Sequence, residues 1–216
     1  YKQPWYQGET VIVGIGQGYT LVTPMQLAQA TATLANDGVA MKPHLVMKIQ
    51  KSMMAESQFI SPIVQGKMVL KSENIAIVKQ GMIDVTLPGG TAASVGANAS
   101  YSIAAKTGTA QVIGIKQNAK YDTSSIDERH RDHALFIAYA PANDPTIALA
   151  VIVENGGHGG SSAGPIARKV MDYYLLGQLP VLDAEKEAKK MPLKPSGNAS
   201  RNITTPQAVA EEELHD

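Results

Sequence analysis

Four adjacent residues of this chain suit catalysis by type and spacing: Lys106, Thr107, Gly108 and Thr109. The lysine can supply a fixed positive charge that lowers the pKa of a neighbouring base or orients a hydroxyl in a proton relay. Two threonine hydroxyls beside that charge can receive a carboxylate, and Gly108 lets a substrate backbone lie close. Small and apolar neighbours predict a β-strand over 101–112, whose edge N–H groups can stabilise an oxyanion. The alternative is a solvated strand lysine next to a turn.

K-T-G is one of the three motifs that form the active site of serine penicillin-binding proteins and β-lactamases. The other two are S-x-x-K and S-x-N or S-D-N, and no serine of this chain precedes a lysine by three residues. Ahead of K-T-G, S-x-N occurs once, at Ser72-Glu-Asn74, where it is predicted to start a helix and lies too close in sequence. The sequence therefore indicates one third of such a site.

Three helices are predicted to surround this strand in the sequence. Thr23 is a candidate N-cap, followed by proline at the first helical position and glutamine at the third, which completes a capping box. A second helix is predicted from Ser72, as N-cap, to about Val85, with an apolar stripe at helical spacing. A third begins with Pro165 and ends before Gly177.

Strands are predicted on both sides of the K-T-G segment. Residues 41–49 are predicted to form an edge strand interrupted by Pro43. Residues 134–140 and 146–153 are predicted to form two strands joined by a connection of hairpin length. With the predicted helices, the strands over 101–112, 134–140 and 146–153 predict a domain that contains both helices and strands.

Composition excludes some functional classes and divides the chain. The 216 residues carry 19 basic and 19 acidic side chains and no basic cluster interleaved with aromatics, which argues against nucleic-acid binding. Cysteine is absent, so disulfides and thiolate metal sites are ruled out in this chain, and no apolar run approaches the roughly 18 residues that span a bilayer.

Residues 1–180 are predicted to be globular, and 181–216 a disordered tail. Because the chain opens at Tyr1 without methionine or signal peptide, we expect any targeting segment upstream.

Two glycine-rich segments raise the possibility of a nucleotide site. Gly14, Gly16 and Gly18 follow an apolar run, but the dinucleotide fingerprint G-x-G-x-x-G requires a different spacing. The loop 155–164 precedes a predicted helix, but it lacks the lysine of a phosphate-binding loop. Both are predicted to be structural, with a place in the wall of a substrate cleft as the lesser alternative for Gln17 or Tyr19.

Two histidines with an aspartate between them raise the possibility of a metal. His130, Asp132 and His133 lie in one loop without the ligand spacing that is usual for a zinc site. No metal site and no cofactor is therefore predicted. The favoured interpretation is that Asp132 or His133 fixes the start of the next strand.

Several segments in the same order resemble class B penicillin-binding proteins. They are Lys2-Gln-Pro-Trp-Tyr-Gln-Gly-Glu-Thr10, Val13-Gly-Ile-Gly-Gln-Gly-Tyr19, Thr23-Pro-Met-Gln-Leu-Ala28, Asn36-Asp-Gly38 with Pro43-His44, and Lys106-Thr-Gly-Thr-Ala-Gln-Val112. Arg131-Asp-His133 and Glu154-Asn-Gly-Gly157 are similar to the penicillin-binding protein 2 branch of that family. The resemblance spans roughly 1–178.

This resemblance implies the C-terminal part of a D,D-transpeptidase domain, with an α+β fold in which a five-stranded antiparallel sheet is flanked by helices. Such enzymes acylate a serine with the D-alanyl-D-alanine end of a peptidoglycan stem peptide and pass the acyl group to an amine, and β-lactams trap the acyl-enzyme. By the family pattern, Lys106 joins a catalytic hydrogen-bond network, and Thr107 and Thr109 hold a carboxylate beside Gly108. The N–H of Thr109 supplies half of an oxyanion hole. The nucleophile is expected upstream of this chain, which alone is expected to be inactive.

The resemblance also implies partners and a location. These are stem peptides, β-lactams, a SEDS-family glycosyltransferase of the RodA type with the elongation machinery, and the N-terminal part of the same protein. The implied location is a periplasmic domain of an inner-membrane-anchored protein. Two alternatives share the fold: a serine β-lactamase, and a non-catalytic sensor or scaffold that binds penicillin.

Overall fold

A computed structural model of the chain describes residues 4–113 and 126–179. Its elements are α1 (Gln7–Gly14), α2 (Pro24–Ala35), β1 (Val39–Met41), β2 (Lys48–Ile49), β3 (Gln58–Phe59), β4 (Val64–Lys67), α3 (Ser72–Asp84), α4 (Ala93–Gly96), β5 (Ala104–Ala110), a 3-10 turn (Glu128–His130), β6 (His133–Ala140), β7 (Ile147–Val153) and α5 (Ala163–Leu176). The predicted tail over 181–216 lies outside the described residues. No helix within the described ranges has the length and apolar character needed to cross a bilayer.

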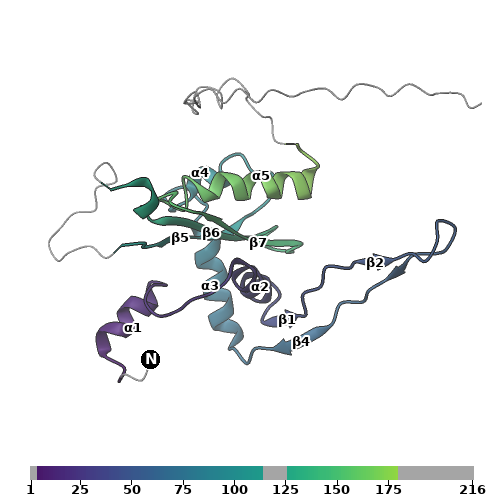
Figure 1. The fold of residues 1–216 in the computed structure, drawn as a ribbon, viewed down its shortest axis with the longest axis horizontal. Coiled ribbons are helices and arrows are strands. Elements are labelled where there is room, and N and C mark those ends of the chain that lie inside the picture. Colours follow the sequence, from purple (N-terminus) through teal and green to yellow (C-terminus); the bar gives the residue numbers. More distant parts are fainter. Residues whose placement is uncertain (1–3, 114–125, 180–216) are drawn as a thin grey trace, which may run out of the picture. The chain divides into compact units, whose positions relative to one another are not determined.

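The central feature is an antiparallel sheet with the strand order β5-β6-β7 (Figure 1). Lys106 of β5 lies opposite Ile137 of β6, and Thr109 lies opposite Ala134. β6 turns back into β7, so Ala140 lies opposite Ile147. The predicted antiparallel sheet is confirmed, and the described residues contribute three strands to it, whereas the family resemblance implies five for the complete sheet.

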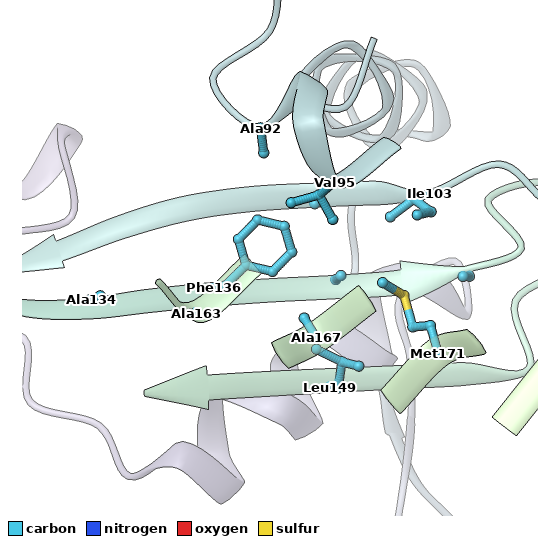
Figure 2. Packing of buried hydrophobic residues seen from close by; sticks show 12 residues of the cluster. Ala92, Val95, Ile103, Ala134, Phe136, Leu149, Ala163, Ala167 and Met171 are labelled. Atoms are coloured by element: carbon cyan, nitrogen blue, oxygen red, sulfur yellow. The ribbon is translucent and has the colours of Figure 1, made fainter. Parts of the chain in front are cut away.

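Helices cover both faces of the sheet, as the α+β prediction requires. Along β6, side chains alternate between the two faces because successive residues of a strand point in opposite directions. Phe136 belongs to a cluster with α4 and α5, whereas Tyr139 belongs to a cluster with α2 and α3. Figure 2 shows Phe136 and Met171 of α5 within the first cluster, which also holds Val95 of α4. Phe136 and Tyr139 of β6 and Met171 of α5 are fully buried. Each face of the sheet therefore packs its helices around a buried aromatic side chain of β6.

The predicted capping residues set the positions of the helices. Thr23 accepts a hydrogen bond from the Gln26 N–H and the Gln26 side chain accepts one from the Thr23 N–H, so the predicted capping box at α2 is confirmed. The N-cap of α3 is Lys71, and Ser72 is already its first helical residue, one position from the prediction. Gly177 ends α5 in the left-handed conformation, with φ of 67°, which glycine adopts without steric cost.

The segment between α2 and α3 differs from its prediction. The expected edge strand over 41–49 is broken into β1 and β2, because Pro43 removes a backbone donor between them. β1 pairs with β4 and β2 pairs with β3, all antiparallel, so residues 39–67 form a two-stranded arm. The returning strands were not predicted, since Val64–Lys67 and Gln58–Phe59 are short, consist of exposed residues and show no apolar alternation.

The N-terminal segment excludes the dinucleotide interpretation. The apolar run 11–13 lies inside helix α1 rather than in a strand. A dinucleotide-binding turn requires a strand directly before its glycines. Gly16 and Gly18 instead take positive φ values of 79° and 90° in the turn that follows α1.

Candidate active site

The four residues predicted to form the site lie consecutively on β5. Lys106 is exposed, whereas Thr107, Gly108 and Thr109 are half-buried. Ala105 belongs to the cluster with α5, so Thr107 and Thr109 share that face and Lys106 and Gly108 take the other. Gly108 faces Leu135 of β6, whose Cβ would lie 3.1 Å from a Cβ added at position 108. The strand therefore presents hydroxyls on one face and an ammonium on the other.

β5 has a paired neighbour on one side, and the opposite side is termed here the free edge. The carbonyl oxygen of Thr107 accepts from Lys106 Nζ at 2.6 Å, and that of Thr109 accepts a long contact from Gln17 Nε2 at 3.5 Å. Both carbonyls therefore point away from β6. In an antiparallel strand a residue directs its N–H and its carbonyl to the same edge. The N–H groups of Thr107 and Thr109 accordingly face the free edge, where an extended substrate can pair with them.

The ammonium of Lys106 lies over this edge. Its contact with the Thr107 carbonyl is a charge-assisted hydrogen bond, which holds the flexible side chain close to the strand backbone. An exposed ammonium has three donors, so two donors remain for a ligand or a neighbouring hydroxyl. The charge is thus placed beside the N–H groups of the free edge.

A second hydroxyl accompanies Thr107. Thr91, in the turn between α3 and α4, has its Oγ1 3.4 Å from that of Thr107, and either oxygen can be the donor. Sequence analysis assigned no role to Thr91. Thr91 and Thr107 are 16 positions apart in the sequence. The Gly89-Gly90 pair before Thr91 indicates a turn, but it does not indicate that this turn lies beside Thr107.

The glycine-rich loop before α5 packs directly on this strand. A Cβ at Gly159 would overlap the carbonyl oxygen of Leu135 and lie 2.8 Å from the Gly108 oxygen and 3.0 Å from the Gly108 nitrogen. A Cβ at Gly160 would lie 2.8 Å from the carbonyl oxygen of Thr91. The predicted role of this loop as a structural connection beside the cleft is supported, because these glycines permit close backbone contact. His158 within it is exposed.

The start of β6 is tied to the end of β7. The Asn155 N–H donates to Nδ1 of His133 at 2.9 Å, and the Asn155 side chain donates to the Arg131 carbonyl at 2.8 Å. The Gly157 N–H donates to the carbonyl of Asp132 at 2.9 Å. His133 therefore fixes the first position of β6, as predicted. Within 4–113 and 126–179, no three His, Asp or Glu side chains gather as metal ligands.

A charged cluster holds the segment that leads into β5. Arg168 of α5 pairs with Asp172 at 2.8 Å and donates to the carbonyls of Val95 and Ala97. The Tyr101 hydroxyl donates to Asp172 at 2.6 Å, and Arg168 lies 5.7 Å from the Tyr101 ring centroid. Burial, reinforced by the hydrogen bond to the Asp172 carboxylate, raises the pKa of Tyr101 above its ordinary value. Sequence analysis did not identify this cluster, which joins residues about 70 positions apart.

An antiparallel sheet with flanking helices and a K-T-G-T edge strand is typical of penicillin-recognising serine acyl-transfer domains. Comparison with known families agrees, because residues 1–172 match the family described as the penicillin binding protein transpeptidase domain. The chain belongs to this family.

Among curated relatives, the peptidoglycan D,D-transpeptidase MrdA of Haemophilus influenzae is 44% identical over 186 residues, which cover 85% of this chain and 28% of the relative. The chain thus spans little more than a quarter of the length of that relative. The Pseudomonas aeruginosa PBP2 structure in complex with WCK 5153 is 45% identical with a TM-score of 0.64, over 85% of this chain and 36% of the other.

Two further structures bear on chemistry and partners. The penicillin G acyl-enzyme complex of penicillin-binding protein A from M. tuberculosis is 32% identical with a TM-score of 0.56, over 76% of this chain and 34% of the other. The complex between PBP2 and MreC from Helicobacter pylori is 27% identical with a TM-score of 0.57, over 81% of this chain and 29% of the other.

Proposed function

We propose that the full-length protein is a peptidoglycan D,D-transpeptidase that works through a serine acyl-enzyme, and that this chain supplies its K-T-G-T strand. The serine hydroxyl, from a segment upstream of this chain, attacks the carbonyl of the penultimate D-alanine of a stem peptide. The terminal D-alanine leaves, and an amine of a neighbouring stem then takes up the acyl group. A β-lactam reacts at the same serine and remains attached.

The observation that carries this proposal is the arrangement of Lys106, Thr107 and Thr109 at the free edge of β5. Lys106 is assigned to the hydrogen-bond network that moves the proton of the serine during acylation. The outward N–H of Thr109 is assigned to the oxyanion of the tetrahedral intermediate, because a preorganised donor is most effective where negative charge develops. The hydroxyls of Thr107 and Thr109 are assigned to the substrate carboxylate, with Gly108 leaving space for the bound chain.

The experiment is an assay of the full-length protein with a synthetic stem pentapeptide as donor and an amine as acceptor. We expect release of D-alanine together with the cross-linked product, and only slow hydrolysis of the chromogenic cephalosporin nitrocefin. Rapid nitrocefin turnover without cross-linking would favour the β-lactamase alternative. Absence of both, with penicillin bound noncovalently, would favour the sensor or scaffold.

The relatives extend the proposal to partners and location. Since a similar PBP2 forms a complex with MreC, we propose that the full-length protein joins the elongation machinery, with a RodA-type SEDS glycosyltransferase as its partner. A catalytic domain that cross-links peptidoglycan is placed in the periplasm and held to the inner membrane by an anchor outside this chain. Co-purification of the full-length protein with the RodA-type partner from solubilised membranes tests this, and its absence at matched expression would contradict it.

A further inference from the structure

We propose that Thr91 is an additional binding residue of the same site, whose hydroxyl joins that of Thr107 in holding the carboxylate of a peptide substrate or a penicillin. This inference rests on the proposed function. The observation behind it is the 3.4 Å separation between the two Oγ1 atoms, which come from β5 and from the turn between α3 and α4.

That separation leaves both hydroxyls available. Hydrogen bonds between hydroxyls are usually about 2.5–3.0 Å long, so at 3.4 Å the two threonines bind each other weakly. A carboxylate offers two acceptor oxygens, and a hydrogen bond to a charged group is stronger than one between neutral groups. An anion beside the two threonines therefore gains a donor from each, and each hydroxyl exchanges a weak contact for a strong one.

The backbone of Thr91 is held in place for this role. Directly before it, a Cβ at Gly90 would overlap the carbonyl oxygens of Asp84 and Val85, so the turn lies against the end of α3. Directly after it, the Ala92 N–H donates to the Val85 carbonyl at 2.9 Å, and Ala92 is buried. Gly160 of the loop before α5 packs on the carbonyl of Thr91 from the other side. The side chain itself stays exposed.

The charge distribution favours an anion over a neutral group. The Nζ of Lys106 lies 2.6 Å from the carbonyl of Thr107, so a positive charge sits at the free edge beside the backbone of the residue that carries one of the two hydroxyls. Thr109 lies two residues further along β5 and places its hydroxyl on the same face as Thr107. Thr91 thus adds a third hydroxyl to the two that β5 presents on this face, next to the charge at the free edge.

The test compares penicillin G with its methyl ester, which removes the carboxylate charge, as acylating agents of the full-length protein. The acylation rate constant divided by the dissociation constant is measured by intact mass for wild type, Thr91→Val and Thr91→Ser. We expect Thr91→Val to lose about tenfold toward penicillin G and less than twofold toward the ester, because a hydrogen bond to a charged group is lost. Thr91→Ser, which keeps the hydroxyl, is expected to stay within about twofold.

Thr146→Val is the matched control, since Thr146 is likewise exposed but lies at the β6–β7 turn. It is expected to leave both rates unchanged. In the double variant Thr91→Val/Thr107→Val, the loss is expected to be smaller than the product of the single losses, because the two hydroxyls share one anion.

Either an equal loss on both reagents or no loss at all in Thr91→Val would overturn the inference. If wild type is acylated while Thr91→Val behaves like wild type, the inference fails and the proposed function stands. If wild type itself forms no acyl-enzyme with penicillin G, the proposed function fails as well.

Discussion

Lys106 is the residue on which the proposed chemistry depends most. Its ammonium is bound to the Thr107 carbonyl and exposed to solvent, so the side chain contributes little to packing. A proton relay in which it takes part should be sensitive to its removal, whereas the fold should not. These two properties separate a catalytic lysine from a structural one.

Replacing Lys106 with alanine in the full-length protein is therefore expected to slow penicillin acylation by about 10²–10⁴-fold, the usual contribution of positioned acid–base groups. The free energy of unfolding is expected to change by less than about 0.5 kcal/mol, as for other surface substitutions. Stopped-flow acylation and thermal unfolding measure the two quantities. Lys169→Ala, at an exposed lysine of α5, is the control and should leave acylation unchanged. Acylation at the wild-type rate in Lys106→Ala would contradict the assigned role.

Tyr101 provides a prediction about pH. Because its pKa is raised in the folded state, its contribution to stability is fully present below the ordinary tyrosine value of 10.0 and is lost as pH rises toward the raised value. Tyr101→Phe is expected to destabilise the full-length protein by about 1–2 kcal/mol at pH 7, through loss of the hydrogen bond to Asp172. Melting temperatures between pH 7 and pH 11 should show a difference that is constant at first and shrinks above pH 10. A difference that persists unchanged to pH 11 would show that Tyr101 is not coupled to Asp172 in this way.

For single residues of the candidate site, the sequence predicted those that are contiguous in the chain and missed those that are far apart in it. Lys106 to Thr109 can be proposed from the sequence because four suitable residues stand together on one strand. Thr91 contacts Thr107 across 16 positions of the sequence. Arg168, which pairs with Asp172, contacts the segment before β5 across about 70 positions. Gln17 was considered as a lesser candidate for the cleft, and its contact with Thr109 spans 92 positions. No local pattern specifies such pairs.

The element that supports β5 most closely is the glycine-rich loop before α5. Its glycines approach the backbone of β5 and β6, and backbone atoms cannot move aside as a flexible side chain can. The shape of the free edge should therefore depend on the absence of side chains in this loop. α3 contains a contrasting glycine, because a Cβ at Gly81 meets nothing within 4 Å.

Gly159→Ala is expected to destabilise the full-length protein by about 1–3 kcal/mol, as overpacking does, and to slow penicillin acylation by displacing Gly108. Gly81→Ala, at an exposed helical position, is expected to stabilise it by about 0.5–1 kcal/mol without affecting acylation. Thermal unfolding and acylation rates are measured for both variants. Wild-type behaviour of Gly159→Ala would mean that the loop does not control the strand.

Among elements, those with strong local signals were predicted and those without were not. α2, the sheet strands and the end of α5 follow from a capping box, apolar runs and Gly177. The edge strand predicted over 41–49 is wrong, because the pairing within the arm over 39–67 depends on register between exposed segments. α1 was not predicted, and it has no buried residue whose spacing could have indicated a helix.

At the scale of the whole molecule, large apolar side chains remain exposed near the N-terminus. Trp5, Ile15 and Leu21 are 61%, 69% and 89% exposed, and none of the residues of α1 is buried. A large contiguous apolar surface would be typical of contact with another polypeptide segment. Under the proposed function, the part of the full-length protein outside these 216 residues is expected to cover these side chains and to bring the serine to the free edge of β5.

The most direct test of this arrangement is to label the full-length protein with fluorescent penicillin and to locate the label by peptide mapping and intact mass. We predict one label per molecule, on a serine outside these 216 residues, and no label on the 216-residue chain when it is supplied alone. A label on a serine within this chain would contradict the view that β5 completes a site whose nucleophile lies elsewhere in the protein.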